Sequence, residues 1–376
     1  MGSKCYTFAM IGALMALAAV LVLAVAAPND LGGWTMGPPL STARSEVAVA
    51  AIGSRLYVVG GFARGGDQRL VEEFDVAAGR WRARASLPHG MNHLGLASFA
   101  GKLYAFGGFS AETGAPSSDA VVYDPATDRW RALAPVPTAR GSISVAVLND
   151  AIHLVGGHDR RSVSTHDVYD PVTNAYTHAA PLPVGRDHMG LAAYGGKLYA
   201  IAGRIDDYSH NTSSCDVYDP ATDRWTACQP MPSRRSGMGV AVYRDRIQAI
   251  GGEERAGVFA NDEAYDPRTN AWTTLAPLPE GRHGMGAATI GDRLYVPAGG
   301  PAPGGSQSTT LFVYELPAPS QRITDSGVTT PTAIPCEFVN ATACASLFAK
   351  CLIASSADVV AATSSRSSTC VMSPVT

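Results

Sequence analysis

The stretch LYAFGG at residues 103–108, followed by VYDPATDRW at residues 122–130, decides the fold because both pieces recur along the chain. VYDPATDRW returns unchanged at residues 217–225, and an apolar run closed by two small residues returns every 46 to 49 residues. The closing pairs are Gly60-Gly61, Gly107-Gly108, Gly156-Gly157, Ala202-Gly203, Gly251-Gly252 and Ala298-Gly299. A period of this length indicates a propeller or solenoid, in which each repeat is one supersecondary unit.

Each repeat predicts four antiparallel strands. The first is rich in small residues, as at 48–50 and 95–97, which suits strands that converge on a narrow axis. The second is an apolar run, and the third and fourth flank a turn such as Asp124-Pro125, where proline pre-sets φ. Two aromatic residues seven positions apart mark those outer strands. They are Phe74 and Trp81, Tyr123 and Trp130, Tyr169 and Tyr176, Tyr218 and Trp225, and Tyr265 and Trp272.

The double glycine, the tyrosine and the tryptophan at these offsets resemble the kelch repeat. The resemblance covers residues 33–317 and implies an all-β fold, a six-bladed kelch β-propeller. The sixth repeat has Tyr314 but Gln321 where the second aromatic belongs, while Trp34 near the start of the chain has no repeat partner. We therefore expect an N-terminal strand to close the last blade, which removes the exposed sheet edges.

The N-terminus predicts a targeting signal. Lys4 precedes an uncharged apolar run from residue 9 to residue 27, and Ala24-Val25-Ala26 offers a small-x-small cleavage site, so residues 1–26 read as a signal peptide. The run is also long enough to cross a bilayer, which leaves an uncleaved signal anchor as the alternative. Either interpretation makes the propeller secreted, extracellular or lumenal, and membrane contact is expected only with an anchor.

Cysteines and sequons agree with that compartment. Cys215 and Cys228 lie symmetrically about the pair Tyr218 and Trp225, so they should face each other on neighbouring strands, and we predict that they form a disulfide. Asn211 and Asn340 begin N-glycosylation sequons. Residues 318–376 form a tail rich in Ser, Thr and Ala, with a possible short helix at 343–354. The tail holds four further cysteines whose pairing stays open, namely Cys336, Cys344, Cys351 and Cys370.

Candidate site residues lie in loops that the fold should bring to one face. An arginine precedes the first strand of five repeats, with Met91 the exception, and we interpret its planar fork as a tie between loops of adjacent blades or as a ring that meets an anionic partner. Two positions after the arginine the residue varies, and a Glu and several His there could transfer protons or hold a metal ion. Polar lining of a wet channel is the favoured interpretation, so no metal and no cofactor are predicted. The candidate binding rim is Arg44, Glu46, His93, Arg140, Arg186, Asp187, His188, Arg204, Arg235, Arg282 and His283.

Function is less constrained than fold. A net charge of −3 argues against nucleic acid as a partner. Tyrosines are occupied by the repeat, which disfavours a copper radical oxidase, and no Glu-x3-Asp-x3-His motif of the nitrile-specifier kelch proteins is present. We expect an extracellular or cell-surface module that binds a protein or glycan through its loop face. The alternative is a secreted sugar or sugar-acid modifying enzyme, similar to the bacterial periplasmic kelch protein that interconverts sialic acid anomers, with catalytic residues unknown.

Overall fold

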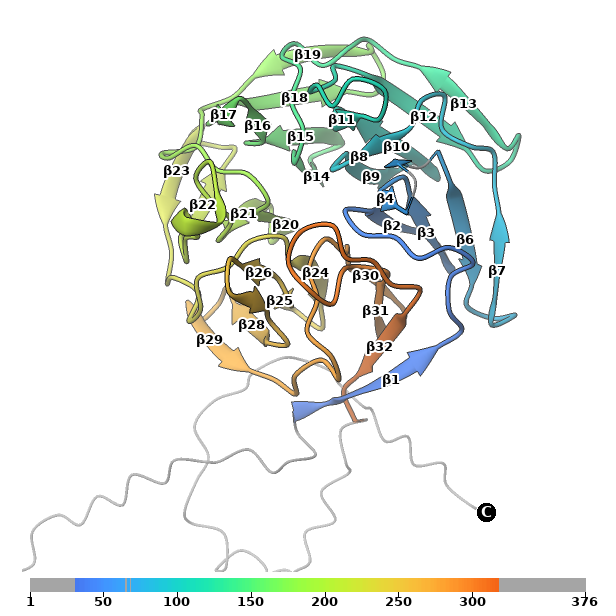
Figure 1. Ribbon diagram of the computed structural model, residues 1–376. Coiled ribbons are helices and arrows are strands. Elements are labelled where there is room, and N and C mark those ends of the chain that lie inside the picture. The colour runs from blue at the N-terminus through green and yellow to red at the C-terminus, as the bar shows by residue number, and fades with distance from the viewer. Residues whose placement is uncertain (1–30, 65, 68, 318–376) are drawn as a thin grey trace, which may run out of the picture. The chain divides into compact units, whose positions relative to one another are not determined.

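The computed structural model describes residues 31–64, 66–67 and 69–317, and these form a ring of six four-stranded antiparallel sheets (Figure 1). The predicted six-bladed propeller is confirmed. From the axis outward, blade one is β2 (Ala48–Ile52), β3 (Arg55–Val59), β6 (Val71–Asp75) and β7 (Arg80–Ala83). Blade two is β9 (Gly95–Phe99), β10 (Lys102–Phe106), β12 (Ala120–Asp124) and β13 (Arg129–Ala132).

The remaining blades repeat this order. Blade three is β14 (Ser144–Leu148), β15 (Ala151–Val155), β18 (His166–Asp170) and β19 (Ala175–His178). Blade four is β20 (Gly190–Tyr194), β21 (Lys197–Ile201), β22 (Cys215–Asp219) and β23 (Arg224–Ala227). Blade five is β24 (Gly239–Tyr243), β25 (Arg246–Ile250), β28 (Asp262–Asp266) and β29 (Ala271–Thr274). Blade six is β30 (Ala288–Ile290), β31 (Arg293–Pro297), β32 (Leu311–Glu315) and β1 (Gly33–Gly37).

Small residues begin the innermost strands because neighbouring blades approach there without room for side chains. A Cβ on Gly95 would lie 2.2 Å from Cγ2 of Val145 in the next blade, and one on Gly190 would meet Val240 at the same distance. The second strands supply the core, and Leu56, Leu103 and Leu198 are fully buried between sheets. The packing between blades therefore depends on size at the axis and on apolar bulk farther out.

The second glycine of each closing pair is required by a close approach of backbone. All six second glycines have positive φ, and a Cβ on Gly61 would lie 2.5 Å from the carbonyl oxygen of Ser45. The first position is less strict, since Ala202 and Ala298 occupy it with φ of 52° and 63°. The second glycine also donates its N–H to the preceding segment of the next blade, as Gly61 does to the Met91 carbonyl at 2.8 Å. The paired glycines thus connect adjacent blades.

The outer aromatic pairs connect blades at the rim. Tyr218 lies opposite Trp225 in the register of β22 and β23, with ring centroids 5.2 Å apart. The Trp225 Nε1–H then donates to the carbonyl of Ala180 in the preceding blade at 2.8 Å. The other blades make the same contact through Trp34, Trp81, Trp130, Tyr176 and Trp272.

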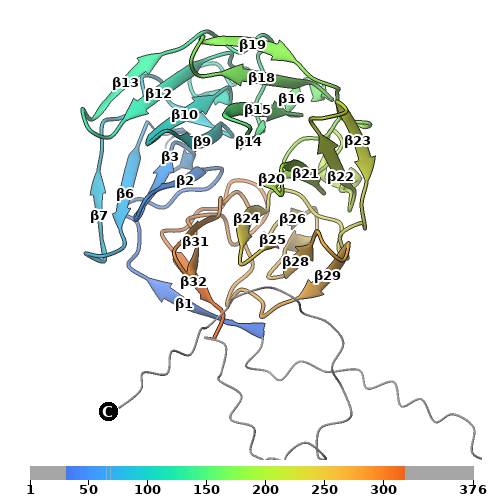
Figure 2. The ribbon, with the colours of Figure 1, turned by 180° about the vertical axis from the view of Figure 1, so that it is seen from behind.

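Ring closure occurs as the sequence predicts. Strand β1 pairs with β32 so that Trp34 lies opposite Tyr314, and both views of the ring show β1 completing blade six (Figures 1 and 2). The Trp34 Nε1–H reaches the carbonyl of Ala276 in blade five. Innermost strand β30 begins at Ala288, two residues later than the repeat indicates.

The predicted disulfide is confirmed, and other sequence predictions meet different outcomes. Cys215 and Cys228 are bonded, with Cα atoms 5.0 Å apart. Asn211 lies in the described region, half-buried, with its Nδ2 donating to the Glu253 carbonyl at 2.8 Å, and its glycosylation stays a prediction. The proposed signal segment, the tail with its four cysteines and Asn340 lie outside the described residues. Within residues 31–317 no helix has the length and apolar character needed to cross a bilayer.

Asp262 is an anomaly in the core of blade five. Its side chain is fully buried, and neither carboxylate oxygen has a hydrogen-bond partner. Burial raises the pKa of this carboxyl well above its ordinary value, and the nearby Arg235 offsets only part of that effect. Because the folded state holds a proton on Asp262 that the unfolded chain releases, this group's stabilising contribution is present at acid pH. It is lost as pH rises through the folded pKa.

We predict that Asp262→Asn becomes increasingly stabilising, relative to the parent, as pH rises. The gain in free energy of unfolding should be near zero around pH 4 and should grow by about 1.4 kcal/mol per pH unit until the folded pKa is passed. Denaturant unfolding of both proteins from pH 4 to pH 8 measures the difference. Parallel stability curves over that range would contradict the assignment of a neutral buried Asp262.

Candidate functional site

The mouth of the central channel is framed by one residue from each blade in the left-handed backbone region. Backbone hydrogen bonds link neighbouring members, since His93 N–H donates to Glu46 O at 3.1 Å and Ser142 N–H to His93 O at 2.8 Å. The bonds continue from Gly237 to His188 and from Gly284 to Gly237. We call these six residues the mouth ring. It consists of Glu46 (φ 52°), His93 (53°), Ser142 (51°), His188 (48°), Gly237 (65°) and Gly284 (62°).

Four members of the mouth ring hold this conformation with side chains that make it costly. Residues other than glycine pay about 1 to 2 kcal/mol in the left-handed region, and blades five and six avoid that cost with Gly237 and Gly284. Strained backbone that persists at polar residues clusters at functional sites. The contrast between glycine and polar residues at one position therefore sets the other four blades apart at the mouth.

We predict that Ser142→Gly stabilises the protein by about 0.5 to 1 kcal/mol, because glycine adopts the left-handed region without the Cβ penalty. The matched control is Ser144→Gly in strand β14. It should destabilise, since Ser144 donates to the Met189 carbonyl at 2.7 Å and lies in an extended strand. Chemical denaturation of both variants measures the two effects, and a loss of stability in Ser142→Gly would count against strain at the mouth ring.

A pocket with a volume of about 520 Å³ opens over one side of the mouth ring. Its walls come from the loops that follow the glycine pairs, including β4 (Phe62–Ala63), β11 (Phe109–Ser110), β16 (His158–Asp159) and the 3-10 turn η2 (Tyr208–His210). We call it the mouth pocket. It is lined by Glu46, Phe62, His93, Phe109, His158, His188, Arg204, Asp206, Tyr208, Gly304, Gly305 and Gln307.

Glu46 lies between two histidines at the base of the mouth pocket. Its Oε2 is 3.1 Å from His93 Nε2, and its Oε1 is 3.3 Å from His283 Nε2. Burial favours the neutral acid, but the two imidazoles outweigh burial and hold the pKa of Glu46 well below its usual range. His283 is itself buried, which lowers its pKa, yet its contacts with Glu46 and Glu253 leave that pKa raised. The low pKa of Glu46 keeps it ionised, and that charge in turn favours the protonated form of His283.

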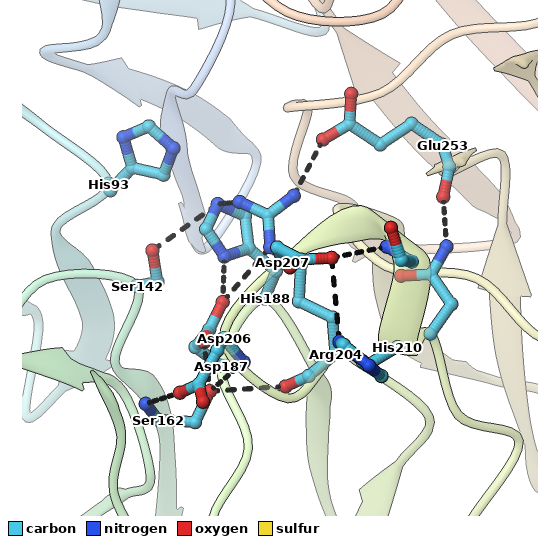
Figure 3. A network of polar contacts seen from close by, with 12 residues as sticks. His93, Ser142, Ser162, Asp187, His188, Arg204, Asp206, Asp207, His210 and Glu253 are labelled. Atoms are coloured by element: carbon cyan, nitrogen blue, oxygen red, sulfur yellow. Dashed lines mark hydrogen bonds and ion pairs between the residues drawn. The ribbon is translucent and has the colours of Figure 1, made fainter. Parts of the chain in front are cut away.

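His188 is held by its own neighbour in sequence. The Asp187 carboxylate lies 2.5 Å from His188 Nδ1, and the other ring nitrogen, Nε2, is 2.9 Å from an Arg204 nitrogen and 3.3 Å from Ser142 Oγ (Figure 3). Burial and the Arg204 charge lower the pKa of His188 to about 4. Since the Asp187 carboxylate accepts a hydrogen bond from Nδ1–H, the neutral ring has its lone pair on Nε2, where Arg204 donates to it.

Arg204 connects Asp187, which holds His188, with Glu253, which contacts His283. Its guanidinium contacts Asp187 Oδ1 and Glu253 Oε1, both at 3.2 Å (Figure 3). The guanidinium carbon also lies 4.3 Å from the centroid of the Tyr208 ring. Glu253 was not among the predicted site residues. The pattern that could have found it is its position directly after Gly251-Gly252, where five loops carry polar or aromatic residues.

The structure corrects the predicted role of the five repeat arginines. Each is buried inside its own blade, and none reaches the mouth pocket. Arg140, for example, donates to the Gly156 carbonyl at 2.9 Å and pairs with Asp167 at 2.9 Å. The connection to the adjacent blade is made by the backbone carbonyl at this position, as with Met91, and not by the guanidinium. The arginines that belong to this set are Arg44, Arg140, Arg186, Arg235 and Arg282.

Blade two lacks the arginine, with Met91 in its place, and it also lacks the acidic residue that pairs with the arginine in other blades. At the position of Glu72, Asp167, Asp216 and Glu263, which pair with arginines, blade two carries Val121. Blade six keeps Arg282 but has Phe312 there, with the guanidinium carbon 4.2 Å from the ring centroid. An apolar pair can replace a buried ion pair, whereas removing one partner leaves a buried charge.

We predict that Arg140→Met alone destabilises the protein by about 3 to 5 kcal/mol, because Asp167 then lacks its buried counter-ion. The double variant Arg140→Met with Asp167→Val copies blade two and should recover most of that loss. A double-mutant cycle by denaturant unfolding gives the coupling energy, and additive losses would refute the pairing.

Among residues 31–64 and 69–317, two groups of side chains are close enough to ligate a metal ion. Glu46, His93 and His188 form one, and Glu46, Glu253 and His283 form the other, with ligand atoms within 4.8 Å of one another in each. In the second group both ring nitrogens of His283 face backbone carbonyls, Nδ1 at 3.2 Å from Gly300 O and Nε2 at 3.0 Å from Gly304 O, so this ring is already engaged on both sides. Of the three histidines in the candidate rim, His93 and His188 come together, with ring centroids 4.8 Å apart, whereas His283 contacts Glu46 and Glu253.

Comparisons with known proteins agree with the fold and the repeat. The family model of the Kelch motif matches residues 43–88, 91–137, 139–183, 185–232 and 234–279. The unmatched sixth blade is the one completed by a strand from the other end of the chain. These matches cover more than half of the chain, and the protein therefore belongs to the kelch-repeat family as a six-bladed propeller.

Individual relatives match over shorter segments. Kelch-like protein 35 of Mus musculus is 30% identical over 129 residues, 34% of this chain and 22% of that protein. Kelch-like protein terF of Aspergillus terreus is 30% identical over 124 residues, 30% of this chain and 27% of that protein. The chain thus matches about a quarter of these relatives' length. Among solved structures, "Structure of YjhT" superposes with a TM-score of 0.64 over 73% of this chain and 95% of that chain, at 17% identity, which shows the fold alone.

Proposed function

We propose that this kelch propeller is an extracellular or cell-surface module that holds a terminal sugar of a glycan in the mouth pocket. Kelch propellers are typically protein-binding modules, but the observation that carries a glycan is the composition of this pocket. Half-buried rings of Phe62, Phe109 and Tyr208 surround convergent charged groups, including Glu46 and Arg204. Apolar walls with a few fixed polar groups are typical of small-ligand sites.

The compartment is part of the same proposal. The apolar segment at residues 9–27 reads as a signal, and a bonded Cys215 and Cys228 suits an oxidising environment. Glycans that a soluble loop face can reach are abundant in that environment. Two measurements test the compartment separately. Appearance of the protein in the culture medium tests secretion, and a change in electrophoretic migration on reduction tests the disulfide.

Arg204 and Tyr208 are the residues to change in a binding test. The full chain, expressed in a secretory eukaryotic host, is applied to a glycan array, and the affinity for a positive glycan is then measured by calorimetry. We predict that Arg204→Met and Tyr208→Ala each weaken binding by about tenfold or more, which corresponds to about 1.4 kcal/mol.

Arg255→Met is the matched control, because Arg255 is an exposed arginine of the neighbouring loop outside the mouth pocket. It should bind as the parent does. Equal losses in Arg204→Met and Arg255→Met would indicate general charge attraction. If the protein bound no glycan of the array but did bind a purified protein, the ligand in the proposal would be a protein and not a glycan.

A sugar or sugar-acid modifying enzyme is the second candidate, and the acid and base groups beside the pocket favour it. Glu46, His93 and His188 all line the mouth pocket, and His93 Nε2 lies 3.1 Å from Glu46 Oε2. If the site is catalytic, Glu46→Gln should retain sugar binding while losing turnover, followed by NMR of anomer exchange. A pure binding site shows no exchange above the uncatalysed rate in either protein.

A further inference from the structure

Three members of the mouth ring bring their ligand atoms within 4.8 Å of one another. Glu46, His93 and His188 come from blades one, two and four, and the left-handed conformation that they share turns their side chains onto the channel mouth. Glu46 Oε2 and His93 Nε2 are 3.1 Å apart. Ligands of one ion at about 2.0 to 2.1 Å lie about 3 to 3.5 Å from one another, so this pair already has the required spacing.

Each of the three side chains is held by a second group. Asn92 Oδ1 lies 2.6 Å from His93 Nδ1, and Asp187 Oδ1 lies 2.5 Å from His188 Nδ1, so both rings turn Nε2 to the channel. His283 contacts the remaining oxygen of Glu46. Metal-bound histidines usually donate their other ring N–H to a carboxylate or carbonyl in this way, which fixes the tautomer and the ring orientation.

We propose that Glu46, His93 and His188 bind one divalent transition-metal ion. Two imidazoles and one carboxylate on one side of an ion suit zinc, iron or cobalt better than calcium or magnesium, which prefer oxygen ligands. The mouth pocket lies above the three side chains, so positions on the ion stay open toward it. The proposal does not depend on the glycan, because the ion would bind with or without it.

Local charge is compatible with a cation. Carboxylates of Glu46, Asp187 and Glu253 surround the site, and the guanidinium of Arg204 and the imidazole of His283 contact them. Arg204 competes with an ion for His188, since it donates to Nε2 at 2.9 Å, and Ser142 Oγ lies 3.3 Å from the same nitrogen. Its contacts with Asp187 and Glu253 can hold the side chain in place after that bond is given up. Arg204 therefore weakens metal binding without preventing it.

The test uses the full chain, stripped with a chelator and titrated with Zn²⁺ alone by calorimetry and with Co²⁺ alone by visible absorption. The expected result is one equivalent bound, with a cobalt spectrum bleached by zinc. His93→Gly should lower the zinc affinity by about 100-fold or more, because a ligand is lost, and Asn92→Ala by about 10- to 100-fold, because the ring loses its support. Glycine at position 93 copies Gly237 and Gly284, so this variant keeps the backbone conformation.

Two further variants separate this site from adventitious binding. His210→Ala removes an exposed histidine beside Asp207 and should leave the zinc affinity unchanged. Arg204→Met should raise the affinity, because Nε2 of His188 is freed and a positive charge is removed. The proposal would be overturned if zinc bound equally well to His93→Gly and Glu46→Gln, or if the zinc affinity fell in His210→Ala. It would also be overturned if calcium bound as tightly as zinc, or if the parent chain bound no zinc.

Discussion

The close approach of six backbones around one axis is the constraint on which the rest of this structure depends. At that radius a Cβ on Gly95 would collide with Val145 of the next blade, and a Cβ on Gly61 would collide with the carbonyl of Ser45. The chain satisfies the constraint with small residues, with left-handed turns and with hydrogen bonds that pass from blade to blade. Those same turns carry the side chains of the mouth ring onto the channel.

In five blades the buried repeat arginine and the mouth-ring residue are separated by only two positions in the sequence. The repeat arginine is buried and binds backbone and a carboxylate within its blade, whereas the mouth-ring residue after it faces the channel. The exchange of an arginine and acid for Met91 and Val121 shows that the first position is about packing. At the second position Glu46, His93 and His188 hold the left-handed conformation that glycine adopts without strain in blades five and six, so packing alone does not account for these residues.

Most of the fold could be predicted from the repeat, including the closing strand at Trp34 and the bond between Cys215 and Cys228. The site was predicted less completely. Asp187, His188, Arg204 and Glu46 were chosen from their offsets, but the arginines were included with them because the offset cannot distinguish a buried side chain from an exposed one. Glu253 was missed because its contact with Arg204 joins loops 49 residues apart.

Sequence by itself determined the blade number, the strand order within each blade and the positions of the turns, because these follow from local residue patterns that repeat with a fixed period. Only the tertiary structure decided which loop side chains meet. His93 comes close to His188 while His283 turns to Glu46 and Glu253, although the repeat places all three at nearly the same offset. A one-residue shift next to a left-handed turn changes the direction of a side chain, and no period in the sequence records that direction.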